Sequence, residues 1–155
     1  MSGAVDRFEE AARARGLRVD VRRFPAGTKT APDAARAVGC EVGQIVKSLV
    51  FMADGEPLLA LTSGANRVDV DKLAALAGAR EVSRADADEA RAATGFAIGG
   101  TPPFGFPRPV QVLMDRDLLA YDEVWAAAGA PDSVFPVAPD ELREAAGAEV
   151  VDLRE

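Results

Sequence analysis

The sequence predicts an α+β fold: a single domain with a mixed, partly barrel-like β-sheet surrounded by short helices. First, the chain has 155 residues, which suits one hydrophobic core. Second, segments with strand and helix patterns follow one another without the regular alternation of βαβ units. Third, residues 44–61 contain two apolar runs on either side of Asp54-Gly55, a pattern typical of a β-hairpin.

The N-terminal quarter of the chain is expected to form a helix, a strand and a second helix. Residues 4–15 have the apolar spacing of an amphipathic helix. Residues 17–24 alternate between apolar and charged side chains, which favours a half-buried strand. Thr30 or Asp33 can then cap a short helix that ends at Gly39.

The predicted hairpin contains the residue that most needs an explanation. Its first strand, residues 44–52, carries apolar side chains on both faces, which indicates burial on both sides. Lys47 lies between Ile45 and Leu49 on one face, where its ammonium group would lose hydration unless an anionic or polar partner receives it. The simpler interpretation is a lysine that reaches the surface or guards an exposed strand edge.

Short elements are expected to fill the second half of the chain. Asp69 caps a helix that ends at Gly78, and Ser83 caps another helix over residues 85–93. The other predicted elements are a strand at 80–82, a strand at 110–114, a helical turn at 115–119, a strand pair at 124–128 and 134–137, a helix at 139–145 and a last strand at 150–153.

The composition excludes several kinds of chemistry. Histidine is absent, which removes histidine-based triads and most zinc sites, and no compact acidic motif supports a magnesium site. We therefore expect no metal and no cofactor. The single cysteine, Cys40, is a weak candidate for a catalytic thiol because no histidine can activate it.

Charge and hydropathy bear on location and partners. The formal charge of −7 disfavours non-specific wrapping of nucleic acid. The chain shows neither a secretion signal nor an apolar run of membrane-spanning length, so we expect a cytoplasmic protein that makes no use of a membrane. These features give no prediction of the oligomeric state.

Residues 94–107 form an unusual loop that holds four of the fourteen glycines and three of the ten prolines. Gly99 and Gly100 place two N–H groups where no Cβ limits a ligand, and both residues can adopt positive φ. Successive N–H groups of this kind bind anions or oxyanions, and the prolines would keep the loop rigid. A proline-rich surface turn is the simpler alternative. The spacing fits neither a Walker A motif nor a Rossmann fingerprint.

Residues 45–51, followed later in the chain by residues 94–105, resemble the YbaK and prolyl-tRNA synthetase insertion-domain family of aminoacyl-tRNA deacylases. The resemblance spans nearly the whole chain and implies that residues 1–155 are one YbaK-like domain. It implies a trans-editing hydrolase that cleaves the ester of a mischarged aminoacyl-tRNA, with a small amino acid and often tRNA for proline. Lys47 matches the functional lysine of the family.

The resemblance also assigns substrate-binding residues, which are Gly99, Gly100, Thr101 and Pro103 in the glycine and proline loop, and Thr30, Ser63 and Asn66 on loops that approach the pocket in such domains. Some relatives, including many insertion domains, place a histidine near residues 129–133. This chain has none there, and Asp132 occupies that neighbourhood. Which amino acid is removed is therefore left open.

The expected chemistry needs no covalent nucleophile, because an aminoacyl ester is already activated and a positioned water with oxyanion stabilisation can suffice. Lys47 is expected to anchor the carbonyl, or the terminal adenosine and its phosphate. The Gly99 and Gly100 amides are expected to bind the carbonyl or the amino end. Expected partners are the acceptor end of mischarged tRNA, with prolyl-tRNA synthetase or an elongation factor as candidate delivery proteins. The alternatives are a non-catalytic tRNA- or synthetase-binding module that uses the same pocket, and a small-ligand or regulatory protein.

Overall fold

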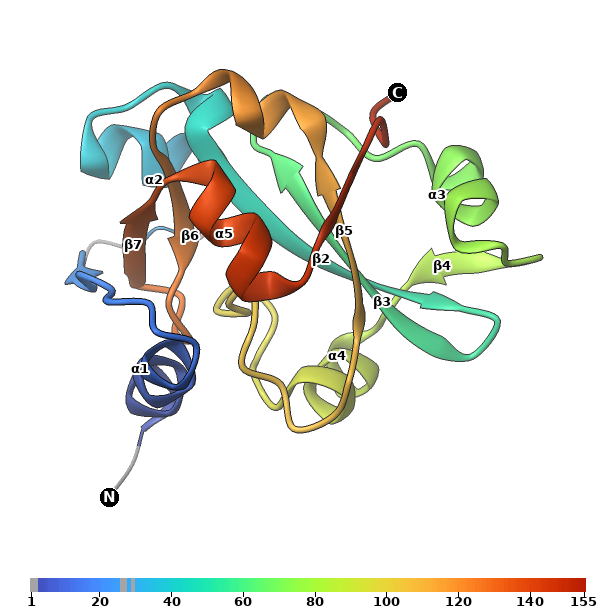
Figure 1. Ribbon diagram of the computed structural model, residues 1–155, viewed down its shortest axis with the longest axis horizontal. Helices are drawn as coiled ribbons and strands as arrows, with labels where there is room; N and C mark the ends of the chain where they lie inside the picture. The colour runs from blue at the N-terminus through green and yellow to red at the C-terminus, as the bar shows by residue number, and fades with distance from the viewer. Residues whose placement is uncertain (1–2, 26–27, 29) are drawn as a thin grey trace.

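A mixed eight-stranded sheet forms the centre of the molecule (Figure 1). The computed structural model describes residues 3–25, 28 and 30–155. In these ranges the strands are β1 (Arg22–Arg23), β2 (Ile45–Ala53), β3 (Glu56–Ser63), β4 (Val82–Arg84), β5 (Gln111–Asp115), β6 (Val124–Ala127), β7 (Ser133–Val137) and β8 (Glu149–Val151).

The strand order is β1-β7-β6-β2-β3-β5-β8, and β4 pairs with β2 outside this path. Three neighbouring pairs are parallel: β2 with β6, β3 with β5, and β5 with β8. The other pairs are antiparallel. The α+β fold and the mixed sheet are therefore confirmed, and the sheet stays open rather than closing into a barrel.

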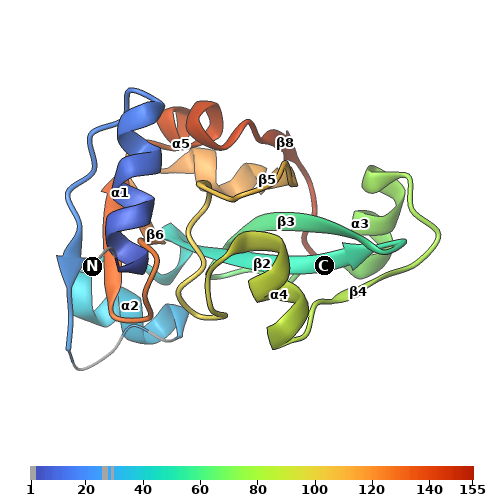
Figure 2. The ribbon, with the colours of Figure 1, turned by 90° about the horizontal axis from the view of Figure 1, so that it is seen from below.

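Short helices cover both faces of this sheet (Figure 2). They are α1 (Ala4–Ala14), α2 (Ala31–Val38), α3 (Val70–Ala77), α4 (Ala87–Thr94) and α5 (Pro139–Ala146), with 3-10 turns at Val42–Gln44 and Arg116–Ala120. The two views place α2 and α3 at opposite ends of β2.

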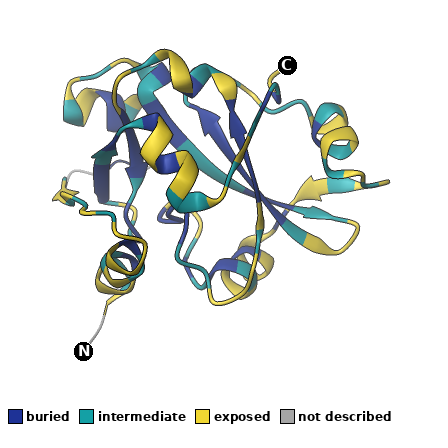
Figure 3. Ribbon diagram, in the orientation of Figure 1, coloured by how far each residue is buried: buried dark blue, intermediate teal, exposed yellow. Residues whose placement is uncertain are grey.

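The alternation of side chains along β2 divides the core into clusters. Val46 and Val50 pack in the largest cluster, to which α1, α4 and α5 also contribute buried residues. Phe51 packs on the other face in a cluster with Leu73 of α3, and Ile45 packs with α2 in a third. Figure 3 shows the result, since the central strands are mostly buried and the helices expose their outer sides. The prediction that β2 is buried on both faces is confirmed at Ile45–Val46 and Val50–Phe51, whereas Lys47–Leu49 and Met52–Ala53 are partly exposed.

Local sequence signals explain several elements well. Asp54 and Gly55 both have positive φ, as a two-residue hairpin turn requires, and β2 pairs with the whole of β3 from Val46 to Ala53. Thr30 caps α2 by accepting a hydrogen bond from the Asp33 N–H, and Asp69 caps α3. These expectations are confirmed.

Two expectations are wrong. Of residues 17–24 only Arg22–Arg23 forms a strand, because β7 offers partners to these two residues alone. The preceding segment packs its apolar side chains against the core as irregular chain. Ser83 lies inside β4, where it pairs with Met52, and the cap of α4 is Asp86. In the described ranges no helix has the length and apolar character that crossing a bilayer requires.

The glycine and proline loop is fixed by buried contacts as well as by its prolines. Phe96 and Phe104 are each 2% exposed, and the Phe104 ring lies 4.9 Å from that of Phe8 in α1. Gly100 packs against the turn between β6 and β7 so closely that a Cβ added to it would lie 2.8 Å from the Cα of Ala130. The loop and that turn are therefore locked together.

Replacing Gly100 with alanine is expected to destabilise the fold by about 1–3 kcal/mol, because the added methyl group must displace backbone atoms. The melting temperature should fall by several degrees. Gly3→Ala is the matched control, since nothing lies within 4 Å of the added Cβ and φ is negative. Equal melting temperatures for the two variants would contradict the close packing.

Candidate active site

One edge of β2 is paired continuously with a single strand, whereas pairing along its other edge is interrupted. Along one edge it pairs with β3 from Val46 to Ala53. Along the other edge, β6 pairs only with residues 45–46 and β4 only with residues 51–53. In the part of the chain that the structure describes, no strand pairs with residues 47–49 on this second edge. The sheet therefore has a gap in its middle.

A cavity of about 420 Å³ lies at this gap, within the usual range for small-ligand pockets. We call it the edge cavity. Its lining comes from β2, the start of α2, the β4–α4 segment, the glycine and proline loop, and β6 and β7: Thr28, Thr30, Ala31, Pro32, Ala34, Ile45, Val46, Lys47, Ser48, Leu49, Val50, Gly64, Arg84, Ala85, Ala90, Ile98, Gly99, Thr101, Trp125, Ala127 and Val134.

Lys47 lines the edge cavity and is partly buried. Its ammonium donates a hydrogen bond of 2.7 Å to the carbonyl oxygen of Asn66. Burial is the main cause that lowers the pKa of Lys47. The positive charges of Arg84 and Arg67 lower it further, and the Asp115 carboxylate opposes them. No salt bridge in the described ranges neutralises this ammonium, which suits an anionic ligand.

A buried carboxylate fixes the carbonyl group that holds Lys47. The Asn66 side-chain amide donates to Asp115 and to Asp117, each at 2.8 Å. The Ser63 N–H donates to the same Asp115 oxygen at 3.1 Å, and Asp115 is only 1% exposed. The turn after β3 is thus a rigid support for Lys47.

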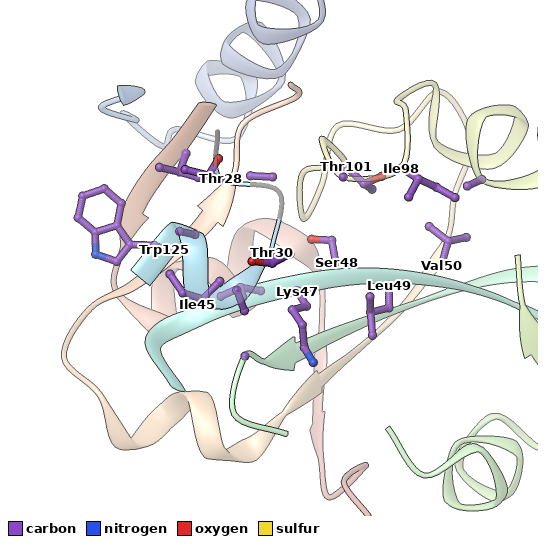
Figure 4. Close-up of a pocket in the computed structure, with 18 of the residues that line it drawn as sticks. Thr28, Thr30, Ile45, Lys47, Ser48, Leu49, Val50, Ile98, Thr101 and Trp125 are labelled. Atoms are coloured by element: carbon purple, nitrogen blue, oxygen red, sulfur yellow. The ribbon is translucent and has the colours of Figure 1, made fainter. Parts of the chain in front are cut away.

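Side chains of β2 around the edge cavity project from both faces of the strand (Figure 4). Ser48 and Val50 project toward Ile98 and Thr101, whereas Lys47 projects to the opposite face. Lys47 is expected to anchor the substrate carbonyl or the terminal adenosine and its phosphate, and the Gly99 and Gly100 amides to bind the carbonyl or the amino end. Of these alternatives, the arrangement does not fit the pair in which the Lys47 ammonium and the glycine amides contact the same carbonyl.

Gly99 and Gly100 differ in conformation and in their contacts. Gly99 has φ of +90° and lines the cavity. Gly100 does not have positive φ, lies outside the lining, and donates its N–H to the carbonyl of Ala97 at 3.1 Å. The prediction of two free adjacent amides is therefore wrong for Gly100. Thr101 lines the cavity, is 3% exposed and donates its hydroxyl to the same Ala97 carbonyl.

Of the remaining predicted residues, one lines the edge cavity and the others lie outside it. Thr30 lines the cavity while it caps α2. Pro103 is buried, and Ser63 donates its hydroxyl to the Gly43 carbonyl at 2.8 Å. Pro103, Ser63 and Asn66 lie outside the lining. Their predicted contact with substrate is thus not supported by their positions.

Asp132 also lies outside the lining, contrary to its predicted role. Its carboxylate accepts hydrogen bonds from the Ser133 hydroxyl and from Arg23. The hydrogen bond from Ser133, followed by that from Arg23, lowers the pKa of Asp132 below its usual value. Asp132 therefore holds the end of β7 against β1.

Sequence reasoning missed Ser48, Arg84, Ile98 and Trp125 as lining residues. They come from separate elements that only the sheet topology brings together. One signal was present for Ser48, a polar residue among apolar neighbours in a strand with two buried faces. Ile98 offered another, since it is 48% exposed in a loop rich in glycine.

The chain is similar to a family of aminoacyl-tRNA editing domains and to several of its relatives. The family model described as the aminoacyl-tRNA editing domain matches residues 25–145. The uncharacterised protein YwhH of Bacillus subtilis is 32% identical over 128 residues, which cover 81% of this chain and 80% of that protein. A crystal structure of a candidate trans-editing enzyme for prolyl tRNA synthetase has a TM-score of 0.94 and 47% identity, and the match covers 100% of this chain and 99% of that one.

A proline–tRNA ligase of Citrifermentans bemidjiense is 34% identical over 107 residues, which cover 69% of this chain. This match spans only 19% of the ligase, so the chain corresponds to about a fifth of that longer protein.

Asp115→Asn is expected to destabilise the protein by about 1–3 kcal/mol, because the new amide group would present N–H groups to buried donors. Chemical denaturation measures this cost. The matched control is Asp122→Asn, at an exposed position on the following loop. If both variants unfold at the same denaturant concentration, Asp115 does not support the turn.

Asp132→Asn is expected to lower stability at neutral pH by about 0.5–1 kcal/mol, as for a partly exposed ion pair. Because the folded-state pKa is lowered, this stability is present above the unfolded pKa of about 4 and is lost as pH falls through the folded value. Denaturation at pH 7 and at pH 3 should show the difference from wild type shrinking. A constant difference would argue against the charge of Asp132 as the cause.

Proposed function

Because the chain belongs to the aminoacyl-tRNA editing domain family, we propose that its edge cavity binds the aminoacyl end of a mischarged tRNA and that the protein hydrolyses the ester there. Water attacks the ester carbonyl, the bond from the carbonyl carbon to the ribose oxygen breaks, and the free amino acid and the tRNA 3′ end are released. The observation that carries the proposal is the cavity at the interrupted edge of β2, which is lined by Lys47 and by Ile98, Gly99 and Thr101 of the glycine and proline loop.

The proposed role of Lys47 is to bind the phosphate of the terminal nucleotide. Its ammonium lies on the face of β2 opposite Ile98 and Thr101, in the electrostatic field of Arg84 and Arg67. Lys47 and Arg84 line the cavity, and the charge of Arg67 also acts on Lys47, so the positive charges here suit a phosphodiester although the whole chain is acidic. The phosphate contact would hold the ester within reach of the opposite face.

Further parts of the proposal come from the relatives. Similarity to proline–tRNA ligases and to the candidate trans-editing enzyme supports tRNA for proline as the carrier and prolyl-tRNA synthetase as a delivery partner. The cavity volume of about 420 Å³ accommodates the small amino acid that the family resemblance implies. We also propose that residues 1–155 act as one editing domain.

Lys47→Ala is expected to lower kcat/KM for deacylation by about 10²-fold or more, because the phosphate loses its charged partner in a cavity that partly excludes water. Release of amino acid from alanyl-, cysteinyl- and seryl-tRNA for proline measures the rate. The matched control is Lys72→Ala, whose ammonium pairs with Asp152 and the Arg154 carbonyl outside the edge cavity. Unchanged turnover in Lys47→Ala would refute the proposed role.

The same panel separates an enzyme from a binding module. Binding of uncharged tRNA without hydrolysis of any misacylated member would identify a non-catalytic module in the same pocket. Contact with phosphate groups should also make tRNA affinity fall as salt rises, whereas a neutral small ligand would respond little.

A further inference from the structure

The register of β2 determines where the main-chain groups of Ser48 point. In an antiparallel pair, alternate residues exchange hydrogen bonds with the partner strand, and the residues between them direct both groups to the other edge. The Gly64 N–H donates to the Ile45 carbonyl, which assigns the odd-numbered residues of β2 to β3. The Val50 carbonyl accepts from the Ala85 N–H, as an even-numbered residue should. Ser48 therefore directs its N–H and C=O into the gap.

The gap leaves these groups without a strand partner in the described part of the chain. β6 ends its pairing at Val46 and β4 begins its pairing at Phe51. The Ser48 hydroxyl is buried and also has no hydrogen-bond partner among the described residues. Because buried polar groups are almost always hydrogen-bonded, this hydroxyl, together with the two main-chain groups that the strand directs toward the cavity, indicates a ligand that supplies the partners.

We infer that Ser48 binds the aminoacyl group of the substrate as if that group were one added strand residue, an inference that rests on the proposed function. An α-amino acid ester carries a donor group, the α-ammonium, on one side of its Cα and an acceptor, the carbonyl oxygen, on the other. In an extended conformation both point to the same side, as in a strand residue. The Ser48 N–H donates to the ester carbonyl, and the Ser48 C=O accepts from the α-ammonium.

In this assignment the Ser48 N–H provides the free main-chain donor that was predicted at Gly100. The Gly100 amide donates to Ala97, whereas the Ser48 amide faces the cavity and can stabilise the oxyanion that forms when water attacks the carbonyl. The ester then lies at the open edge of β2, between the face that carries Lys47 and the face that meets Ile98 and Thr101.

The test measures amide hydrogen exchange of Ser48 by NMR in the full chain. The probe is a non-hydrolysable 3′-aminoacylamino-3′-deoxyadenosine that carries the amino acid removed fastest in the deacylation panel, or alanine if none is removed. Saturating probe should slow exchange of the Ser48 amide at least about 10-fold, because the amide becomes hydrogen-bonded. The same probe without its α-amino group should bind roughly 10- to 100-fold more weakly, since it loses a charge-assisted hydrogen bond. Adenosine alone should leave the Ser48 amide unchanged.

A pair of variants tests the same contact through the reaction. Ser48→Pro removes an N–H that is not used in the β2–β3 ladder, so an edge proline is compatible with the strand. Ser48→Ala keeps that N–H. We expect kcat/KM to fall at least about 10-fold more in Ser48→Pro than in Ser48→Ala. Hydrogen exchange of the β3 amides reports whether the sheet is intact in each variant.

The outcomes separate this inference from the proposed function. Hydrolysis of the panel with no change at the Ser48 amide, or equal affinity for the two probes, would overturn the inference and leave the function standing. Absence of probe binding at millimolar concentration would also overturn it. Protection of the Ser48 amide with no hydrolysis of any panel member would support the binding mode and reject the deacylase.

Discussion

The site depends on a break in the pairing of one strand. β6 and β4 approach the same edge of β2 from opposite ends and stop before they meet, which leaves residues 47–49 without a strand partner there. A sheet edge is normally covered or protected because its main-chain groups seek partners. Here the uncovered stretch is partly exposed and lines the edge cavity together with the start of α2 and the glycine and proline loop. Main-chain groups that a continuous sheet would use internally are thereby left for a ligand.

Much of the fold was predictable because its signals are local. The Asp54-Gly55 turn, the Thr30 and Asp69 caps and the alternation along β2 each depend on residues close together in the chain. Lys47 was also predictable as a candidate, since a charged residue in a strand with two apolar faces requires a partner. The resemblance to the editing family added the glycine loop, which no local pattern connects with β2.

The errors concern contacts between distant segments. The Gly100 amide turns back to Ala97, and its Cα packs on Ala130 of the β6–β7 turn, a contact that no spacing indicates. The Asp132 carboxylate accepts a hydrogen bond from Arg23, which lies 109 positions earlier in the chain. The open edge of β2 follows from where two other strands end. A strand pattern predicts that a strand forms, but it does not predict how much of each edge is covered.

The walls of the edge cavity have a consequence for how such proteins diversify. Ile98, Ala127 and Val134 are among its lining residues, whereas the inferred contacts of Ser48 with the substrate use main-chain groups, which are common to all amino acids other than proline. Substitution of a wall residue alters the volume and shape offered to a substrate without disturbing the main chain. In the inferred binding mode, the α-ammonium and the ester carbonyl are bound by main-chain groups, which no side-chain substitution other than one to proline removes. Single substitutions in the cavity wall can therefore change which amino acid is accepted while the reaction stays the same.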